Sequence, residues 1–445
     1  MIFTMPADKE LTEDRLKKCI EKHAAEVTKR YQVLQDAYMT KYEIDNMEKK
    51  DAWKPDNRLK FNFAKYIVDT MNGFFIGNPI KLSVDEGDEG VSDYLEFLDQ
   101  YNDQDDNNAE LSKICSIYGS GFEMYYVDEL GNIGITYLNP MECFMIVDDS
   151  ILQRERYFVR VFKDEDGDIC GSVADSQMIR WFKLKGKIVW GDEKVHGFDG
   201  VPATEFVENA ERQGIFEPVM SLINAYNKGM SEKANDVDYF ADAYLKILGP
   251  YLDEDDTKNI RTNRIINFDG DAKEMIVEFL QKPDGDVTQE HLLDRLERLI
   301  FQLSMVANIS DENFGTSSGI ALKYKLQSMS NLEKTKERKF TSGMNRRYKI
   351  IFSNPVNQMH ADDWVKIHVH FTPNIPANLL EETQIVQNLQ GLVSQETYLK
   401  ILSIVDDVKA EIDRIVEEDK KLKQDPVMDQ MFNHAHTEEG EVNEQ

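Results

Sequence analysis

The stretch Ser310–Leu326, SDENFGTSSGIALKYKL, decides how the middle of this 445-residue chain is organised. Two glycines, Gly315 and Gly319, permit a tight reversal of the backbone that residues with a Cβ would make only under strain. Either Ser317 or Ser318 can cap the helix that follows, because a serine hydroxyl accepts hydrogen bonds from the free amides of a first helical turn. The pattern predicts a compact polar loop held between two rigid helices.

Helical patterns flank this loop on both sides. Before it, leucine and valine recur at steps of three and four, and after it one long helix is predicted over Ile320–Phe352. The second helix carries nine lysines and arginines within Lys323–Lys349 but only two acidic residues, Glu333 and Glu337. Such a helix is an ordinary solvated face, a surface that meets phosphates, or a dock for acidic neighbouring copies. If many copies assemble, the last interpretation is the most economical.

The charge of the whole chain has the opposite sign. It holds 82 acidic against 52 basic residues, a net charge of −30, and its 41% hydrophobic residues are typical of a globular protein. Proteins that grip DNA usually carry an excess of Lys and Arg, because contacts with phosphates supply most of the affinity. The chain therefore either avoids nucleic acid or touches it in a way that does not become tight binding.

Nothing in the sequence indicates export or membrane insertion. The four cysteines are widely spread and form no CxxC, which predicts reduced core thiols: Cys19, Cys115, Cys143 and Cys170. The N-terminal stretch turns charged at once, unlike a signal peptide. No apolar run approaches the roughly 20 residues that span a bilayer. We expect a soluble protein that does not contact membranes.

The first half of the chain changes from helical to strand-like patterns. Steps of three and four predict helices over residues 11–48, 57–79, 92–101 and 107–118. From Gly121 to Phe206 the period becomes two, and turn signals such as Gly131-Asn132 recur. We interpret residues 121–206 as an antiparallel meander.

The second half is predicted to be mainly helical, so the fold is α+β and predominantly helical. A long helix is expected over Phe216–Leu248, where apolar and small residues alternate at steps of four and three. Further elements are a mixed insert at 250–287, a strand at Val365–Phe371, helices at Thr383–Leu392 and Gln395–Val416, and a disordered acidic tail beyond Lys420.

Candidate metal sites are weak. The segment Asp164–Asp168 has the carboxylates of a calcium loop, but its glycine comes too early and no terminal Glu is in register, so a hairpin turn is far better supported. His368 and His370 share one face of a strand and could reach one metal, yet no third ligand is visible. We predict surface or interface histidines, and neither a metal nor a cofactor.

Nucleotide and nucleophile motifs are also missing. No GxxxxGK[ST] occurs, and Gly119-Ser-Gly121 lacks the GxSxG spacing of a nucleophile turn. The loop with Gly315 and Gly319 could bind an anion at the following helix N-terminus, but a plain helix–helix turn explains it equally well.

Taken in order, several stretches resemble the portal proteins of tailed bacteriophages, of the type found in long-tailed phages of Gram-positive bacteria. Each is weak alone, and their order makes them specific. They are NRLKFNFAKYIVDTMNGFFIGNPI (57–80), GSGFEMYYVDELGNI (119–133), YLNPMECFMIVDD (137–149), the segment from GVPATEF to AYLKILG (200–249) and SDENFGTSSGIALKYKL (310–326).

The resemblance implies a portal fold with wing, stem, clip and crown regions. The implied boundaries are 1–215 for the wing with its meander at 121–206, 216–249 for the first stem helix, 250–287 for the clip, 288–309 for the second stem helix, 310–319 for the tunnel loop, 320–375 for the long basic wing helix and strand, 376–419 for the crown helices and 420–445 for the tail.

The resemblance also implies a function and partners. A dodecameric ring at one capsid vertex would let double-stranded DNA enter and leave, and would meet the terminase packaging motor, a head-completion adaptor, and the major capsid and scaffolding proteins. The protein would be assembled in the host cytoplasm and reside in the virion. The residues expected to face DNA are Asp311, Glu312, Asn313, Phe314, Gly315, Thr316, Ser317 and Ser318.

Two rival functions remain as alternatives to this non-enzymatic conduit. A nucleic-acid-modifying enzyme that uses a metal would need carboxylates clustered in a cleft, and the sequence names none. A scaffolding or adaptor protein would be mostly helical with few aromatic residues, which the strand-rich segment 121–206 contradicts.

Overall fold

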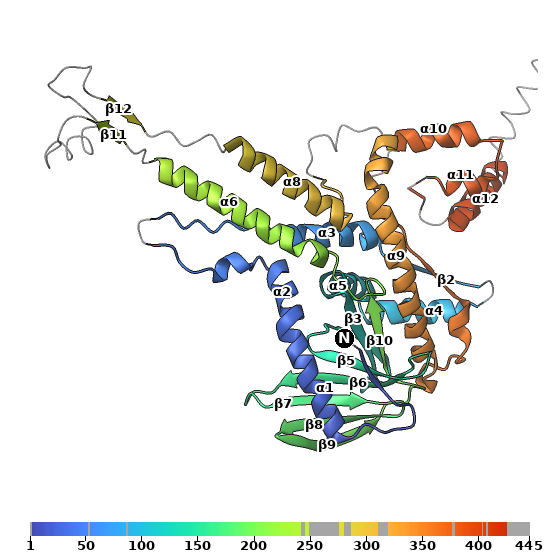
Figure 1. Cartoon of the computed structure of the whole chain (residues 1–445). Helices are drawn as coiled ribbons and strands as arrows, with labels where there is room; N and C mark the ends of the chain where they lie inside the picture. Colours follow the sequence, from blue (N-terminus) through green and yellow to red (C-terminus); the bar gives the residue numbers. More distant parts are fainter. Residues whose placement is uncertain are drawn as a thin grey trace, which may run out of the picture. The chain divides into compact units, whose positions relative to one another are not determined.

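The computed structural model describes residues 2–51, 54–85, 88–241, 245–248, 276–279, 286–309, 319–375, 379–402, 404–405 and 408–424. The chain divides into two compact units. The first comprises Met1–Asp311 with Lys325–Asn374, and the second comprises Glu312–Tyr324 with Ile375–Gln445. Helices and sheets both contribute, so the α+β class is confirmed (Figure 1).

The strands over residues 120–207 belong to two sheets rather than one meander. Five consecutive strands, β5 to β9, do run antiparallel as predicted, and a short N-terminal strand pairs with β5 in parallel. However, β10 returns to pair with β3, which with β4 makes a separate three-stranded sheet, so the single meander over 121–206 was wrong. Alternation identifies strands but does not choose their partners. The strands are β1 Ile2–Met5, β3 Ser120–Val127, β4 Ile133–Leu138, β5 Cys143–Asp148, β6 Glu155–Lys163, β7 Ile169–Ala174, β8 Met178–Lys185, β9 Lys187–Val195 and β10 Ala203–Val207.

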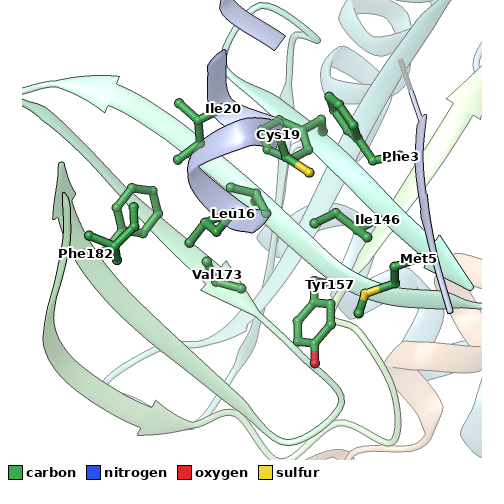
Figure 2. Packing of buried hydrophobic residues seen from close by; sticks show 12 residues of the cluster. Phe3, Met5, Leu16, Cys19, Ile20, Ile146, Tyr157, Val173 and Phe182 are labelled. Atoms are coloured by element: carbon green, nitrogen blue, oxygen red, sulfur yellow. The ribbon is translucent and has the colours of Figure 1, made fainter. Parts of the chain in front are cut away.

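Both faces of the six-stranded sheet are covered, which explains why every residue of β5 is buried. On one face, helix α1 (Glu13–Glu26) places Leu16, Cys19 and Ile20 against the sheet, as Figure 2 shows. On the other face, Phe122 and Ala203 of the three-stranded sheet join a second buried cluster. Burial of both faces requires near-continuous apolar sequence, and CFMIVD in β5 provides it.

The N-terminal helices differ in detail from the prediction. The helix expected over 11–48 is continuous only over Glu13–Tyr38, where α1 passes through a π-helical turn, Val27–Tyr31, into α2 (Gln32–Tyr38). Helix α3 (Phe63–Ile76) starts six residues later than expected. Its N-cap Asn62 accepts a hydrogen bond from the Lys65 amide at 2.9 Å, and the preceding residues are extended. The next helices, α4 (Glu89–Tyr101) and α5 (Gln104–Tyr118), agree with the prediction.

The long helix predicted over Phe216–Leu248 is shorter. Helix α6 spans Met220–Ala241, and Leu245–Leu248 forms β11, which pairs with β12 (Ile276–Phe279). Pairing between strands overrides a local helical preference here. Most of the segment predicted as the clip, residues 250–275 and 280–285, lies outside the described residues.

The last elements of the first unit are largely as expected. They are α8 (Asp286–Ser304), α9 (Gly319–Phe352), whose residues up to Tyr324 belong to the second unit, and β13 (Ile367–His370), which pairs with β2 (Lys81–Val84).

The described part of the second unit contains three further helices instead of the two predicted: α10 (Leu379–Leu389), α11 (Gln395–Leu399) and α12 (Val408–Gln424). The helix α12 passes Lys420, where the tail was expected to begin, and residues 425–445 lie outside the described part. Within the described part of the chain, none of the helices combines the length and the hydrophobicity that a membrane span requires.

Candidate functional site

The residues predicted to face DNA form the connection between α8 and α9. All of them lie outside the described residues: Asp311, Glu312, Asn313, Phe314, Gly315, Thr316, Ser317 and Ser318. What the structure does describe is the pair of helices that carry this connection and the contacts that hold each of them. These contacts decide how firmly the two helices are held.

The arm before the loop is an antiparallel pair made by α6 and α8, which lie side by side (Figure 1). A Cβ added to Gly229 of α6 would come within 3.0 Å of a Leu293 methyl group, so the absence of a side chain allows this close approach. Farther along, Lys233 of α6 pairs with Glu290 of α8. The positions rise on one helix as they fall on the other, which fixes the antiparallel direction.

Aromatic residues hold the base of this pair. The ring of Phe63 at the start of α3 lies 5.0 Å from Tyr226 of α6 and 5.7 Å from Phe301 of α8, edge to face in both cases. Where the chain leaves α8, the Ile309 amide donates to the Tyr66 hydroxyl at 2.8 Å. The last described residue before the loop is therefore tied to α3.

A ladder of hydrogen bonds joins α6 to the extended segment before α3. The amides of Asn57, Leu59 and Phe61 donate to side-chain oxygens of Asn235, Ser231 and Asn227 at 2.6, 2.9 and 2.8 Å, respectively. The match arises because four helical residues rise about 6 Å and two extended residues about 6.6 Å. Every second amide of the segment thus meets every fourth residue of the helix.

The arm after the loop, α9, is fixed by a buried ion pair. The Lys336 ammonium lies 2.8 Å from a Glu208 carboxylate oxygen, and both side chains are 1% exposed. Lys336 also donates to the Ser116 hydroxyl at 2.6 Å and to the Ser112 carbonyl at 3.1 Å. These partners satisfy all three ammonium protons, as a buried lysine requires.

A second buried pair lies three turns farther along α9. The Arg347 guanidinium donates to both oxygens of Glu123 on β3 at 2.7 and 2.8 Å, and to the Asn108 side chain at 2.6 Å. Burial opposes the charge of Arg347, but the Glu123 carboxylate leaves the pKa of the guanidinium above its ordinary value. The Tyr125 hydroxyl lies 3.2 Å from a Glu123 carboxylate oxygen and 2.8 Å from the Thr204 hydroxyl. The network ties α9 to α5 and to the three-stranded sheet.

Comparison with known proteins adds a family to this geometry. The family profile "Phage portal protein, SPP1 Gp6-like" matches residues 16–425. The chain belongs to this portal family. A "Portal protein" of Clostridium phage phiCD119 is 25% identical over 430 residues, which cover 88% of this chain and 91% of the relative. A solved structure described as "Neck of empty GTA particle computed with C6 symmetry" covers 76% of this chain and 89% of its own, with 11% identity and a TM-score of 0.47.

Within this portal protein, the basic helix is not a uniform face. Of its nine basic residues, Lys336 and Arg347 are buried and neutralised inside the chain, whereas Lys323, Lys325, Lys334, Arg338 and Lys349 are exposed. The interpretation of the whole run as one outward-facing surface missed these two. Their positions carried a signal, because they fall on the same helical stripe as the buried Phe340 and Met344.

The remaining candidates have structural roles. Asp164–Asp168 is the turn between β6 and β7, so the predicted hairpin is confirmed. His368 and His370 lie on β13 and contact Asp85 and Ser83 at 2.8 and 2.7 Å. No group of three potential metal ligands occurs among the residues that the structure describes. All four cysteines are buried and free, as predicted.

Proposed function

We propose that this portal protein forms the ring at the capsid vertex through which viral DNA is packaged and ejected, with residues 310–318 narrowing the channel. The observation that carries the proposal is that both helices bordering this segment are fixed independently. One is held by the aromatic contacts at Phe63, and the other by the buried pairs of Lys336 and Arg347. A loop between rigid supports can hold a defined position in a channel.

The composition of the loop suits a surface that DNA slides past. It offers an amide at Asn313 and hydroxyls at Thr316, Ser317 and Ser318, but no lysine or arginine. Each tight contact with a phosphate adds a salt-dependent barrier to movement, so weak and interchangeable contacts favour passage. The carboxylates of Asp311 and Glu312 repel the phosphates of the DNA and keep the DNA away from the channel wall.

The regions beyond the loop are proposed to meet other proteins. The paired strands β11 and β12 follow α6 and precede α8, and we assign residues 250–287 to contact with the packaging motor and later with the head-completion adaptor. The segment 376–419 is assigned to the capsid interior. Force must come from the separate motor, since we propose no catalysis by this chain. The rival metal-dependent enzyme gains no candidate site in the described part of the chain.

The test replaces Asn313–Ser318 by a Gly-Ser linker of equal length. We expect rings of normal size, because the supporting contacts lie elsewhere, and a clear loss of packaged DNA in an assembly reaction with motor and capsids. A matched replacement of the exposed Leu130–Gly131 turn on the wing should package normally. Normal packaging by the loop variant would remove residues 313–318 from the mechanism.

A further inference from the structure

The pairing of α6 with α8 leaves one apolar stripe partly exposed on each helix. On α8, Leu293 lies against Gly229 of α6, Leu296 and Ile300 continue its row along the helix, and all three are buried. A second row on the same helix consists of Leu292, Leu299 and Leu303, and the outer two are each 55% exposed. Since successive residues turn by about 100°, this second row, here called the leucine stripe, lies on one line about 90° from the buried row.

Helix α6 has a corresponding row. Gly229 and Lys233 face α8, and Met230, Ala234 and Val237 follow a line about 100° away from that contact. Val237 is 62% exposed, and Met230 and Ala234 are half-buried. We call these three residues the α6 stripe.

The two stripes point to opposite sides of the plane through the two helix axes. In an antiparallel helix pair, two rows that are rotated in the same sense around their own helices, away from the contact, lie on the same side of this plane. The leucine stripe and the α6 stripe are rotated in opposite senses, so they lie on opposite sides. The aromatic residues agree with this geometry. Tyr226 of α6 and Phe301 of α8 both reach Phe63, so α3 lies on the side of the α6 stripe. The leucine stripe is on the other side.

Charge is distributed in a complementary way. Arg295 lies beyond the leucine stripe, is exposed and forms no ion pair with any residue that the structure describes. Glu290 and Asp294 of α8 are exposed on the side of the α6 stripe. One side of the helix pair therefore presents leucines with a basic edge, and the other presents Met, Ala and Val with an acidic edge.

We propose that the leucine stripe of one copy packs on the α6 stripe of the next copy, with Arg295 of the first copy meeting Asp294 of the second. This inference rests on the proposed ring and names the surfaces that build it. Two different patches on opposite faces give a head-to-tail contact, which closes into a ring when the rotation between copies allows. The small side chain of Ala234 lets the leucines approach closely.

A mixing experiment tests this pairing. One variant carries Leu292→Asp and Leu299→Asp, and the other carries Ala234→Asp and Val237→Asp. Leu130→Asp is the control, because Leu130 is 81% exposed in the turn between β3 and β4. Native mass is measured for each, and circular dichroism verifies folding. We expect rings from the control, single copies from each double variant, and two-copy complexes from their equimolar mixture, since one intact leucine stripe then meets one intact α6 stripe.

The outcomes separate the inference from the proposed function. Rings formed by either double variant, or a mixture that stays single-copy while the unmodified chain forms rings, would overturn the pairing alone. An unmodified chain that forms no ring would instead overturn the proposed function.

A charge reversal adds a readout that a folding defect does not produce. Arg295→Glu should raise the concentration at half-assembly about tenfold, and adding Asp294→Arg in every copy should restore it. Failure of this rescue would refute the pairing of the two edges.

Discussion

The region around α9 differs from the α6–α8 pair in whether one chain supplies all the partners of its side chains. The face of α9 toward the sheet contains two cations, Lys336 and Arg347, and each has its counter-charge within the same chain at 2.7–2.8 Å. The α6–α8 pair leaves Leu292, Leu303 and Val237 more than half exposed. The first region is complete in one copy of the chain. The second becomes complete only when another copy covers it.

This difference follows from the cost of leaving groups unmatched. A buried charge without a partner is strongly unfavourable. A buried cation on α9 is therefore stable only if its counter-charge is buried beside it in the same folded chain. An exposed leucine costs little in an isolated chain and becomes favourable when a neighbour buries it. The comparison predicts large stability effects around α9 and small ones on the leucine stripe, where assembly responds instead.

The largest effect is expected at Arg347. Replacing Arg347→Met leaves the Glu123 carboxylate buried without its partner, which should lower the free energy of unfolding by about 3–5 kcal/mol. Denaturant unfolding measures the change. The control is Arg338→Met on the exposed face of the same helix, with a change within about 0.5 kcal/mol. Adding Glu123→Met should recover most of the loss, and equal effects of Arg347→Met and Arg338→Met would contradict the account.

The buried cations also show which contacts could not be predicted from the sequence. The loop's supporting helices, the hairpin at Asp164–Asp168 and the portal resemblance could be read from periodicity and motif order. The partners of Lys336 and Arg347 could not, because Glu208 and Glu123 lie more than 120 residues away and only the fold brings them together. Pairing of β10 with β3 has the same cause. The end of α6 was missed because the β11–β12 ladder competes with helix.

A smaller effect is expected in the ladder between α6 and the extended segment. Asn227→Ala leaves the partly buried Phe61 amide without its acceptor, so we expect a loss of about 1–3 kcal/mol in the free energy of unfolding. Asn224→Ala on the same helix, where no such bond is made, is the matched control. Hydrogen exchange at Phe61 should become faster only in the first variant. Unchanged exchange there would show that the ladder does not hold the segment.

The third effect depends on pH. Burial raises the pKa of Asp99 from 3.8 to about 6, with Arg347 opposing the shift and Asp105 adding to it. The folded state therefore favours the neutral carboxyl. The stability that the neutral Asp99 carboxyl contributes is complete below its ordinary pKa of 3.8 and is lost as pH rises through about 6.

Asp99→Asn removes this loss. The variant should be more stable than the unmodified chain by about 1–2 kcal/mol at pH 8, with the difference disappearing near pH 4. Unfolding measured across this range checks the prediction, with the exposed Asp93→Asn as control. A stabilisation that did not vary with pH would argue against titration of Asp99 as its cause.

The smallest effect on the single chain is expected on the leucine stripe. Leu292→Ser with Leu303→Ser should change the free energy of unfolding of an isolated copy by no more than about 0.5 kcal/mol, since both side chains are already largely exposed. Assembly should nevertheless be strongly weakened. A loss of stability comparable to that of Arg347→Met would mean that the stripe belongs to the core of one copy and would remove the contrast between the two regions.

The native mass of the purified chain, measured together with electron-microscope images of the particles, tests the central claim most directly. The account predicts closed rings whose mass is a whole-number multiple of the chain mass, with an open central channel. A single copy that forms no ring under any condition of concentration or salt would contradict it.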